Sequence, residues 1–233
     1  MKVLKFTEKQ TFISESAKVI AEACPAEESG RPGYLAFSGG STPKDVYLHF
    51  AKRYFPFIKV RLRGFVVDER YVSETDVNSN WGMLQKIILH HGKTHATDSF
   101  EQFHYFNTTL PIENAVIEYE KVLQSMEEQG FTFDLVILGM GTDGHTASLF
   151  PHSPALYEEL KMALHTTTDT HDVRDRLTMT FPTILSAKKI LLLLSGPEKK
   201  EILDKLLHSD ASIEELPSKR LLEHENLVIH YLK

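Results

Sequence analysis

The segment from Phe133 to Pro151 constrains the fold of this chain more than any other. It contains an unbroken apolar run, Leu135 to Leu138, followed by a turn with three glycines, Gly139, Gly141 and Gly144. A continuous apolar run is typical of a strand buried on both faces of a parallel sheet, and a glycine-rich turn often follows such a strand. The segment therefore predicts an α/β protein, in which ligands bind beyond the carboxyl ends of the strands.

The same turn carries Asp143 and His145, two residues apart. Histidine can take up and return a proton near neutral pH, and a nearby carboxylate can orient it or balance its charge. We therefore predict a catalytic loop, with a plain turn and a surface histidine as the alternative. A dinucleotide-binding fingerprint is disfavoured, because it needs a long helix after its third glycine and Pro151 limits that helix to about two turns.

Composition excludes several classes of function. The 233 residues suffice for one large α/β domain or two small ones, and we predict one domain over residues 1–233. The net charge of -6 comes with interspersed charges and without a basic stripe, so neither a nucleic-acid nor a membrane partner is expected.

The amino terminus has no apolar segment of secretory length, and the run Ile190 to Leu194 is too short to span a bilayer. We expect a cytoplasmic protein.

Apolar residues recur at two spacings, one typical of strands and one of helices, and the two alternate along the chain. Strands are predicted at Tyr34 to Phe37, Phe65 to Val67, Leu135 to Leu138, Ala163 to Thr167, Leu177 to Phe181, Ile190 to Leu194 and Leu227 to Tyr231. Helices are predicted after a capping box of Thr7 and Gln10, from Pro43 onward, from Asn80 to His90 and from Pro111 to Glu128. This alternation predicts a mostly parallel, doubly wound sheet with helices on both faces.

A second glycine-rich segment, Ser38 to Pro43, lies between a predicted strand and a predicted helix. Its glycines let the backbone turn sharply, and Thr42 as N-cap with Pro43 as first helical residue marks the helix start. Backbone amides, hydroxyl groups and the helix dipole favour an anion there, and without Walker spacing a sugar monophosphate fits better than a nucleoside triphosphate. We predict a phosphate cradle made of Ser38, Gly39, Gly40, Ser41 and Thr42. An ordinary tight turn is the alternative.

A third polar segment, Asp68-Glu69-Arg70, follows the predicted strand that ends at Val67. Three successive side chains on an extended chain cannot all point the same way, so we expect at least one to face the pocket and another to anchor the loop. Arg70 could donate two hydrogen bonds to a phosphate. A solvated charge cluster is the alternative interpretation.

In this order along the chain, the motifs resemble those of the 6-phosphogluconolactonases of the glucosamine-6-phosphate isomerase/6-phosphogluconolactonase family. They are Ser38 to Pro43, Val67 to Arg70, Ser79-Asn80 and Gly139 to Pro151, with less specific matches at Arg176 to Thr180 and Gly196 to Lys199. The resemblance implies a sugar-phosphate isomerase-like α/β fold and hydrolysis of 6-phospho-D-glucono-1,5-lactone in the oxidative pentose phosphate pathway. It implies a small sugar-phosphate lactone as the partner, and neither a metal nor a cofactor.

The resemblance also implies roles for single residues. His145 would be the catalytic residue with Asp143 assisting, while Asp68, Arg70 and Lys199 would hold the substrate, the last two at its phosphate. His165 and His171 have no spacing that suggests a metal site, and we interpret them as structural or solvent-facing. A monomer or a small homo-oligomer is expected.

A deaminase and a sugar-phosphate sensor are the two alternatives to the lactonase. In the related glucosamine-6-phosphate deaminases, tyrosine follows the Asp-Glu pair and a glutamate lies five residues after the histidine, whereas this chain has Arg70 and Phe150 there. Both differences disfavour the deaminase. A non-catalytic sugar-phosphate sensor, as in some transcription regulators, is disfavoured because the chain is acidic and has no spare length for a helix-turn-helix unit.

Overall fold

A seven-stranded sheet in the order β1-β10-β9-β6-β2-β3-β5 forms the centre of the molecule. We describe it from a computed structural model, which covers residues 1–58, 61–89 and 102–233. Every pair of neighbours in this sheet is parallel, as predicted. Its strands are β1 (Lys2–Phe6), β2 (Gly33–Phe37), β3 (Leu62–Val66), β5 (Phe103–His104), β6 (Leu135–Leu138), β9 (Ile190–Ser195) and β10 (Leu227–Leu232).

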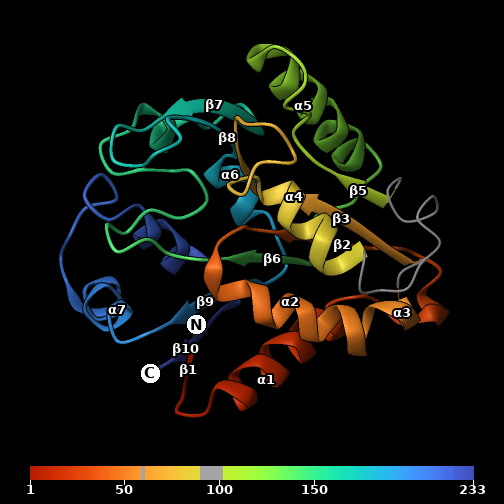
Figure 1. The fold of residues 1–233 in the computed structure, drawn as a ribbon, viewed down its shortest axis with the longest axis horizontal. Coiled ribbons are helices and arrows are strands. Elements are labelled where there is room, and N and C mark those ends of the chain that lie inside the picture. The colour runs from red at the N-terminus through yellow and green to blue at the C-terminus, as the bar shows by residue number, and fades with distance from the viewer. Residues whose placement is uncertain (59–60, 90–101) are drawn as a thin grey trace.

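Helices cover both faces of this sheet, again as predicted (Figure 1). One face packs against α1 (Lys9–Glu22), α2 (Ser41–Arg53), α3 (Phe55–Ile58) and α4 (Asn80–Leu84), which continues into the π-helix η3 (Gln85–Leu89). The other face packs against α5 (Ile112–Glu128), α6 (Phe181–Leu185) and α7 (Lys199–His208). Short 3₁₀ helices are η1 (Glu27–Ser29), η5 (Pro154–Tyr157) and η6 (Pro217–Glu223). Among the described residues, no helix is both long enough and apolar enough to cross a membrane.

Strand β6 shows why its sequence is an unbroken apolar run. Val136 and Leu138 belong to the core on the α5 side, whereas Leu135 and Ile137 belong to the core on the α1 and α2 side. All four side chains are buried. Because successive side chains of a strand point to opposite faces, a strand covered on both sides needs an apolar residue at every position.

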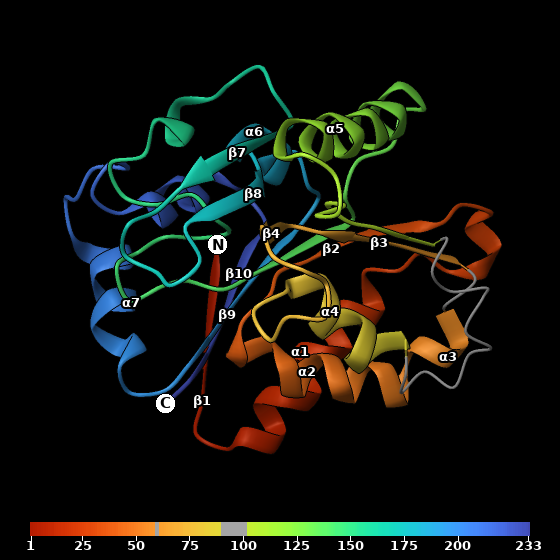
Figure 2. The ribbon, with the colours of Figure 1, turned by 45° about the horizontal axis from the view of Figure 1, so that its top comes forward.

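Two predicted strands lie in a separate sheet. β4 (Asp68–Arg70), β8 (Asp175–Met179) and β7 (Ala163–Thr167) form a three-stranded antiparallel sheet, so their assignment to the parallel sheet was wrong. A short connection such as residues 168–174 joins antiparallel neighbours, whereas a parallel pair needs a crossover of a dozen residues or more. Figure 2 shows the β7–β8 pair above the main sheet, on the side of α5.

Two predicted helix starts and one predicted helix were wrong. Helix α2 begins at Ser41 with Gly40 as its N-cap, at φ 101, so Thr42 is not the N-cap and Pro43 is the third helical residue. A positive φ at Gly40 suits glycine, and proline is tolerated in a first helical turn. Helix α1 has Glu8 rather than Thr7 as its N-cap, without a side-chain cap bond. The helix expected after Gly144 is replaced by turns. The predicted helix from Asn80 is present, but its expected end, His90, lies outside the described residues.

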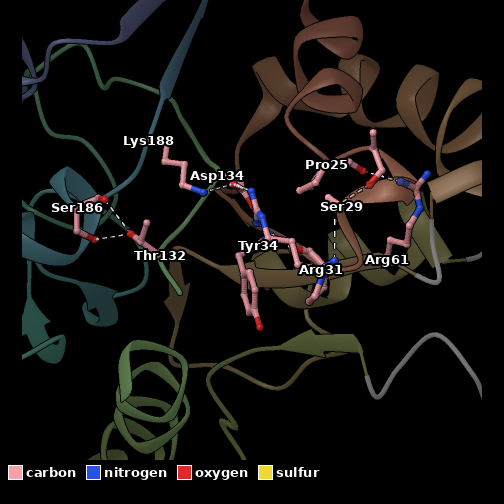
Figure 3. A network of polar contacts seen from close by, with 11 residues as sticks. Pro25, Ser29, Arg31, Tyr34, Arg61, Thr132, Asp134, Ser186 and Lys188 are labelled. Carbon is pink, nitrogen blue, oxygen red and sulfur yellow. Dashed lines mark hydrogen bonds and ion pairs between the residues drawn. The ribbon is translucent and has the colours of Figure 1, made fainter. Parts of the chain in front are cut away.

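A polar network holds the amino-terminal edge of the sheet together (Figure 3). The buried carboxylate of Asp134, just before β6, accepts two hydrogen bonds from Arg31, one from Lys188 and one from the Tyr34 amide. Burial raises the pKa of this carboxyl, but the hydrogen bonds from Arg31, Lys188 and Tyr34 outweigh burial, and the pKa lies below its ordinary value. The network therefore ties together the segments that lead into β2, β6 and β9.

Asp134→Ala is expected to lower the free energy of unfolding by about 1–3 kcal/mol, because it removes several charge-assisted hydrogen bonds. The cost stays below that of a fully buried ion pair, since Arg31 and Lys188 are partly exposed and would regain water. Urea denaturation of both proteins measures the difference. Asp169→Ala, which removes an ion pair between exposed side chains with Arg174, is the control and should change stability little.

We expect His230 to make the free energy of unfolding depend on pH. His230 lies in β10, and its buried imidazole bonds Ser16 Oγ of α1 at 2.8 Å. Burial, together with the charge of Lys2, lowers the pKa of His230 to about 4, whereas an unfolded histidine titrates near pH 6.5. Between these values the unfolded chain binds a proton that the folded protein does not, so the free energy of unfolding falls as the pH falls, by up to about 3 kcal/mol.

Urea denaturation across that pH range tests this expectation. Carboxylates such as Asp134 also lose their contribution in acid, so the comparison protein is the double variant Ser16→Ala/His230→Phe, which removes both hydrogen-bonding partners. Between about pH 6.5 and 4, the free energy of unfolding of this variant should fall less steeply as the pH falls. The difference between the two slopes should correspond to close to one bound proton. If the free energy of unfolding changes equally with pH in the two proteins, His230 does not cause the pH dependence.

Candidate active site

The predicted site residues come together at the carboxyl edge of the sheet, in two adjoining cavities that share Gly40, Ser41, Arg70, His145 and Lys199. Asp143 lines one of the two cavities, and the other is lined by Ser38, Gly39, Thr42 and Asp68. The ten residues follow different strands, namely β2, β3, β6 and β9. They meet because parallel strands present their carboxyl ends at one edge of a sheet.

The turn after β6 holds the aspartate and the histidine in contact. Asp143 Oδ1 lies 2.6 Å from His145 Nδ1 and also accepts a hydrogen bond from the His145 amide. Burial raises the pKa of Asp143, but the hydrogen bond and charge of His145 outweigh it, so that this pKa is lowered. A Cβ at Gly141 would lie only 2.2 Å from His145 Nδ1, so the pair fits only beside glycine. The histidine is thereby oriented with its Nδ1 toward the carboxylate.

The loop before α2 is shaped by contact with α4. A Cβ at Gly39 would lie 1.7 Å from Asn80 Oδ1, so glycine allows Asn80 to pack directly on this loop. Asn80 Nδ2 in turn donates to the carbonyl of Asp68. Ser38 Oγ is buried and has no hydrogen-bond partner among the described residues. The loop therefore presents a buried hydroxyl beside the amino terminus of α2, where an anion is favoured.

Strand β4 uses its acidic and basic side chains differently, as the alternation of a strand requires. The buried Glu69 carboxylate accepts hydrogen bonds from four donors, which are the amides of Arg70, Asn80 and Trp81 and the hydroxyl of Ser79. Burial raises the pKa of Glu69 to about 7, against the effect of these donors. Asp68 and Arg70 line the cavity instead. One acid thus anchors the loop while its neighbours face the pocket, as expected.

Three cations surround one end of the site. Arg70 and Arg176 lie directly opposite each other in the β4–β8 pair. Arg70 and Lys199 donate to the carbonyl oxygens of Asn78 and Met140, both at 2.7 Å. Like charges opposite each other destabilise a sheet unless something compensates them. Burial, and then the charge of Arg70, lowers the pKa of the Arg176 guanidinium. The corner is therefore suited to an anion.

The sequence interpretation missed two residues of the site. His171, interpreted as structural or solvent-facing, lines the same cavity as Asp143, and its ring centroid lies 5.2 Å from that of His145. Arg176 was noted as part of a motif but not as a site residue. Arg176 is placed in the site by the register of the β4–β8 pair, in which it lies opposite Arg70. The sequence of β8 alone does not reveal this pairing. By contrast, His165 bonds Asp175 and does not line either site cavity.

Comparison with known proteins identifies the family. A family model described as glucosamine-6-phosphate isomerases/6-phosphogluconolactonase matches residues 7–229. The chain belongs to this family. A probable 6-phosphogluconolactonase from Dictyostelium discoideum is 30% identical over 96% of this chain and 94% of its own length. A probable 6-phosphogluconolactonase from Schizosaccharomyces pombe is 36% identical, over 83% of this chain and 77% of its own length.

Solved structures of proteins with different activities share the fold of this chain. The crystal structure of 6-phosphogluconolactonase from Thermotoga maritima has a TM-score of 0.83, at 27% identity, and covers 100% of this chain and 99% of its own. A monomeric glucosamine-6-phosphate deaminase has the same TM-score of 0.83, at 23% identity, and covers 100% and 98%. The fold therefore does not separate lactonase from deaminase, and that choice depends on the site residues.

Proposed function

We propose that this chain, acting as one domain over residues 1–233, hydrolyses 6-phospho-D-glucono-1,5-lactone to 6-phospho-D-gluconate in the oxidative pentose phosphate pathway. The 6-phosphogluconolactonases among its relatives support this activity, and Phe150 is the residue that argues against the deaminase. The Phe150 ring lies 4.7 Å from that of His145, and the guanidinium of Arg176 lies 5.7 Å above it. At this position the deaminases have the glutamate that assists opening of the amino-sugar ring. A buried phenyl ring cannot supply that carboxylate.

In the proposed mechanism, His145 acts first as a base and then as an acid. With Nδ1 donating to Asp143, the lone pair of Nε2 can take a proton from water. The water oxygen bonds to the lactone carbonyl carbon, and the bond from this carbon to the ring oxygen then breaks. The protonated His145 returns its proton to the departing ring oxygen, which becomes a hydroxyl group. Asp143 stabilises the charged imidazole in between.

The developing oxyanion needs hydrogen-bond donors, and the backbone amides of the turn from Gly139 to Gly144 are the first candidates. Two of these backbone amides already donate hydrogen bonds within the turn. The amide of Gly141 donates to the carbonyl of His145, and the amide of Gly144 donates to the carbonyl of Gly141. These two amides hold the turn in shape, so we propose that the oxyanion is bound by other donors of the site.

We propose that the substrate phosphate binds between the loop Ser38–Thr42 and the cations Arg70 and Lys199. Both cations are held by backbone carbonyls, which position them without neutralising their charge. The unpartnered hydroxyl of Ser38 and the opposed Arg176 support an anion at this corner. Far from the reacting carbonyl, the phosphate would supply the binding energy that positions the lactone at His145.

The activity is tested by following acid release from freshly generated 6-phosphogluconolactone, with the spontaneous rate subtracted. Acceleration by the unmodified protein is the expected result, together with no release of ammonia from glucosamine 6-phosphate. Ammonia release without lactone hydrolysis would replace the lactonase by the deaminase. Binding of sugar phosphates without turnover of either compound would favour the sensor.

Other expectations remain predictions. They are a cytoplasmic location, a monomer or small homo-oligomer, activity without a metal or cofactor, and the lack of nucleic-acid and membrane partners. Activity after exhaustive treatment with a chelator tests the requirement for a metal. Sedimentation of the purified protein measures its oligomeric state.

A further inference from the structure

Three side chains that commonly bind metal ions meet at the mouth of the site. Asp143 and His145 come from the turn after β6, and His171 comes from the connection between β7 and β8. Each offers a ligand atom, and these atoms all lie within 4.8 Å of one another. His171 Nε2 lies 3.9 Å from Asp143 Oδ2, while His145 Nδ1 lies 2.6 Å from Asp143 Oδ1. Two imidazoles thus flank one carboxylate.

We propose that Asp143, His145 and His171 bind a divalent transition-metal ion such as Zn²⁺, and that the bound ion inhibits the enzyme. Two imidazoles and a carboxylate are a ligand set that Zn²⁺ accepts, with the fourth position open to water. Zinc bonds of about 2.0–2.1 Å place tetrahedral ligand atoms roughly 3.4 Å apart. The two separations between imidazole nitrogens and carboxylate oxygens, 2.6 and 3.9 Å, lie on either side of that value. All three side chains are partly exposed, so small side-chain rotations can complete the site.

Inhibition follows from the tautomer of His145, and this part of the inference rests on the proposed function. In the free protein Nδ1 donates to Asp143, which leaves the lone pair of Nε2 to accept a proton from water. A neutral imidazole that binds metal through Nδ1 has its proton on Nε2 and cannot accept another. If the metal binds Nε2 instead, that lone pair is occupied. In either case His145 no longer acts as a base.

The surrounding charge limits the affinity. Arg70, Arg176 and Lys199 line the same cavity, and their positive charges oppose a dication. Binding should therefore be weaker than at structural zinc sites, and a chelator should reverse it. This distinguishes an inhibitory ion from a resident cofactor, because removal of the ion should raise activity rather than abolish it.

Calorimetric titration of chelator-treated protein with ZnCl₂ tests the site without reference to activity. The unmodified chain should bind one ion, and His171→Gln should weaken binding at least about tenfold, since even outer-shell changes at metal sites cost about 10- to 100-fold. His165→Gln is the matched control, because His165 also bonds an aspartate, at 2.8 Å, but lies outside the cluster. It should leave the affinity unchanged. Circular dichroism checks that both variants fold.

Equal zinc affinity of the unmodified and His171→Gln proteins would overturn the site. Lactone hydrolysis then tests inhibition, with each rate divided by the same protein's metal-free rate. The zinc concentration for half inhibition should rise at least about tenfold in His171→Gln and stay unchanged in His165→Gln. Zinc binding without inhibition would overturn the inhibitory part. If the protein hydrolyses no lactone at all, the proposed function fails, while the calorimetric titration still decides whether the metal site exists.

Discussion

Replacing His145 by alanine is expected to lower kcat for lactone hydrolysis by about 10²- to 10⁴-fold, the usual contribution of a general base. KM should change little, because the phosphate contacts that hold the substrate remain. Asp143→Asn should cause a smaller loss, since the imidazole can keep a hydrogen-bonding partner but loses the charge beside it. Acid release above the spontaneous rate measures all three proteins.

His165→Ala is the control for this experiment. Its imidazole also bonds an aspartate, Asp175 at 2.8 Å, but lies outside both site cavities, so its loss should leave kcat unchanged. Equal activity of a folded His145→Ala variant and the unmodified protein would remove His145 from the mechanism while keeping the lactonase. Asp68, which also lines the cavity, would then become the base to test.

Arg70→Met is expected to raise KM by about 10- to 100-fold and to change kcat much less. Hydrogen bonds to charged groups contribute about 1.5–3 kcal/mol, and each 1.4 kcal/mol is a factor of ten in affinity. Methionine keeps much of the length of the side chain but removes its charge. Initial rates over a range of lactone concentrations separate KM from kcat.

Two controls separate phosphate binding from a general disturbance of the site. Arg174→Met removes a nearby arginine that pairs with the exposed Asp169, and it should leave KM unchanged. Glucono-1,5-lactone, which lacks the phosphate, should be hydrolysed with the same KM by Arg70→Met and by the unmodified protein. A rise in KM for this compound as well would show that Arg70 shapes the site rather than binding phosphate.

The sequence predicts the inner strands of the parallel sheet well, because burial on both faces leaves a simple pattern, whereas the edge strands β1 and β5 were not predicted. The run Leu135 to Leu138 needs an apolar residue at each position, and the same holds for Ile190 to Leu194. The glycine-rich segments then locate the site, since loops after parallel strands share one edge of the sheet. Ten residues from separate motifs could thus be predicted to lie together, although their roles in binding and catalysis stay predictions.

The misplaced features depend on contacts that no local pattern records. The apolar alternation of β7 and β8 suits either sheet, so only pairing places Arg176 opposite Arg70. The start of α2 depends on the positive φ of Gly40, which glycine permits but does not require. His171 reaches the site from a connection 26 residues beyond His145, a contact made in space and without a periodic signal.

The place of β10 in the sheet has a consequence for synthesis of the protein. β10 lies between β1 and β9, and its register pairs Lys2 with Val228. On a ribosome, β1 is made first among the strands, yet its partner is made last. The rest of the sheet can form while the chain grows, but β1 must wait until Leu227–Leu232 have emerged. We therefore expect nascent chains stalled before β10 to leave β1 unpaired and open to proteases and chaperones.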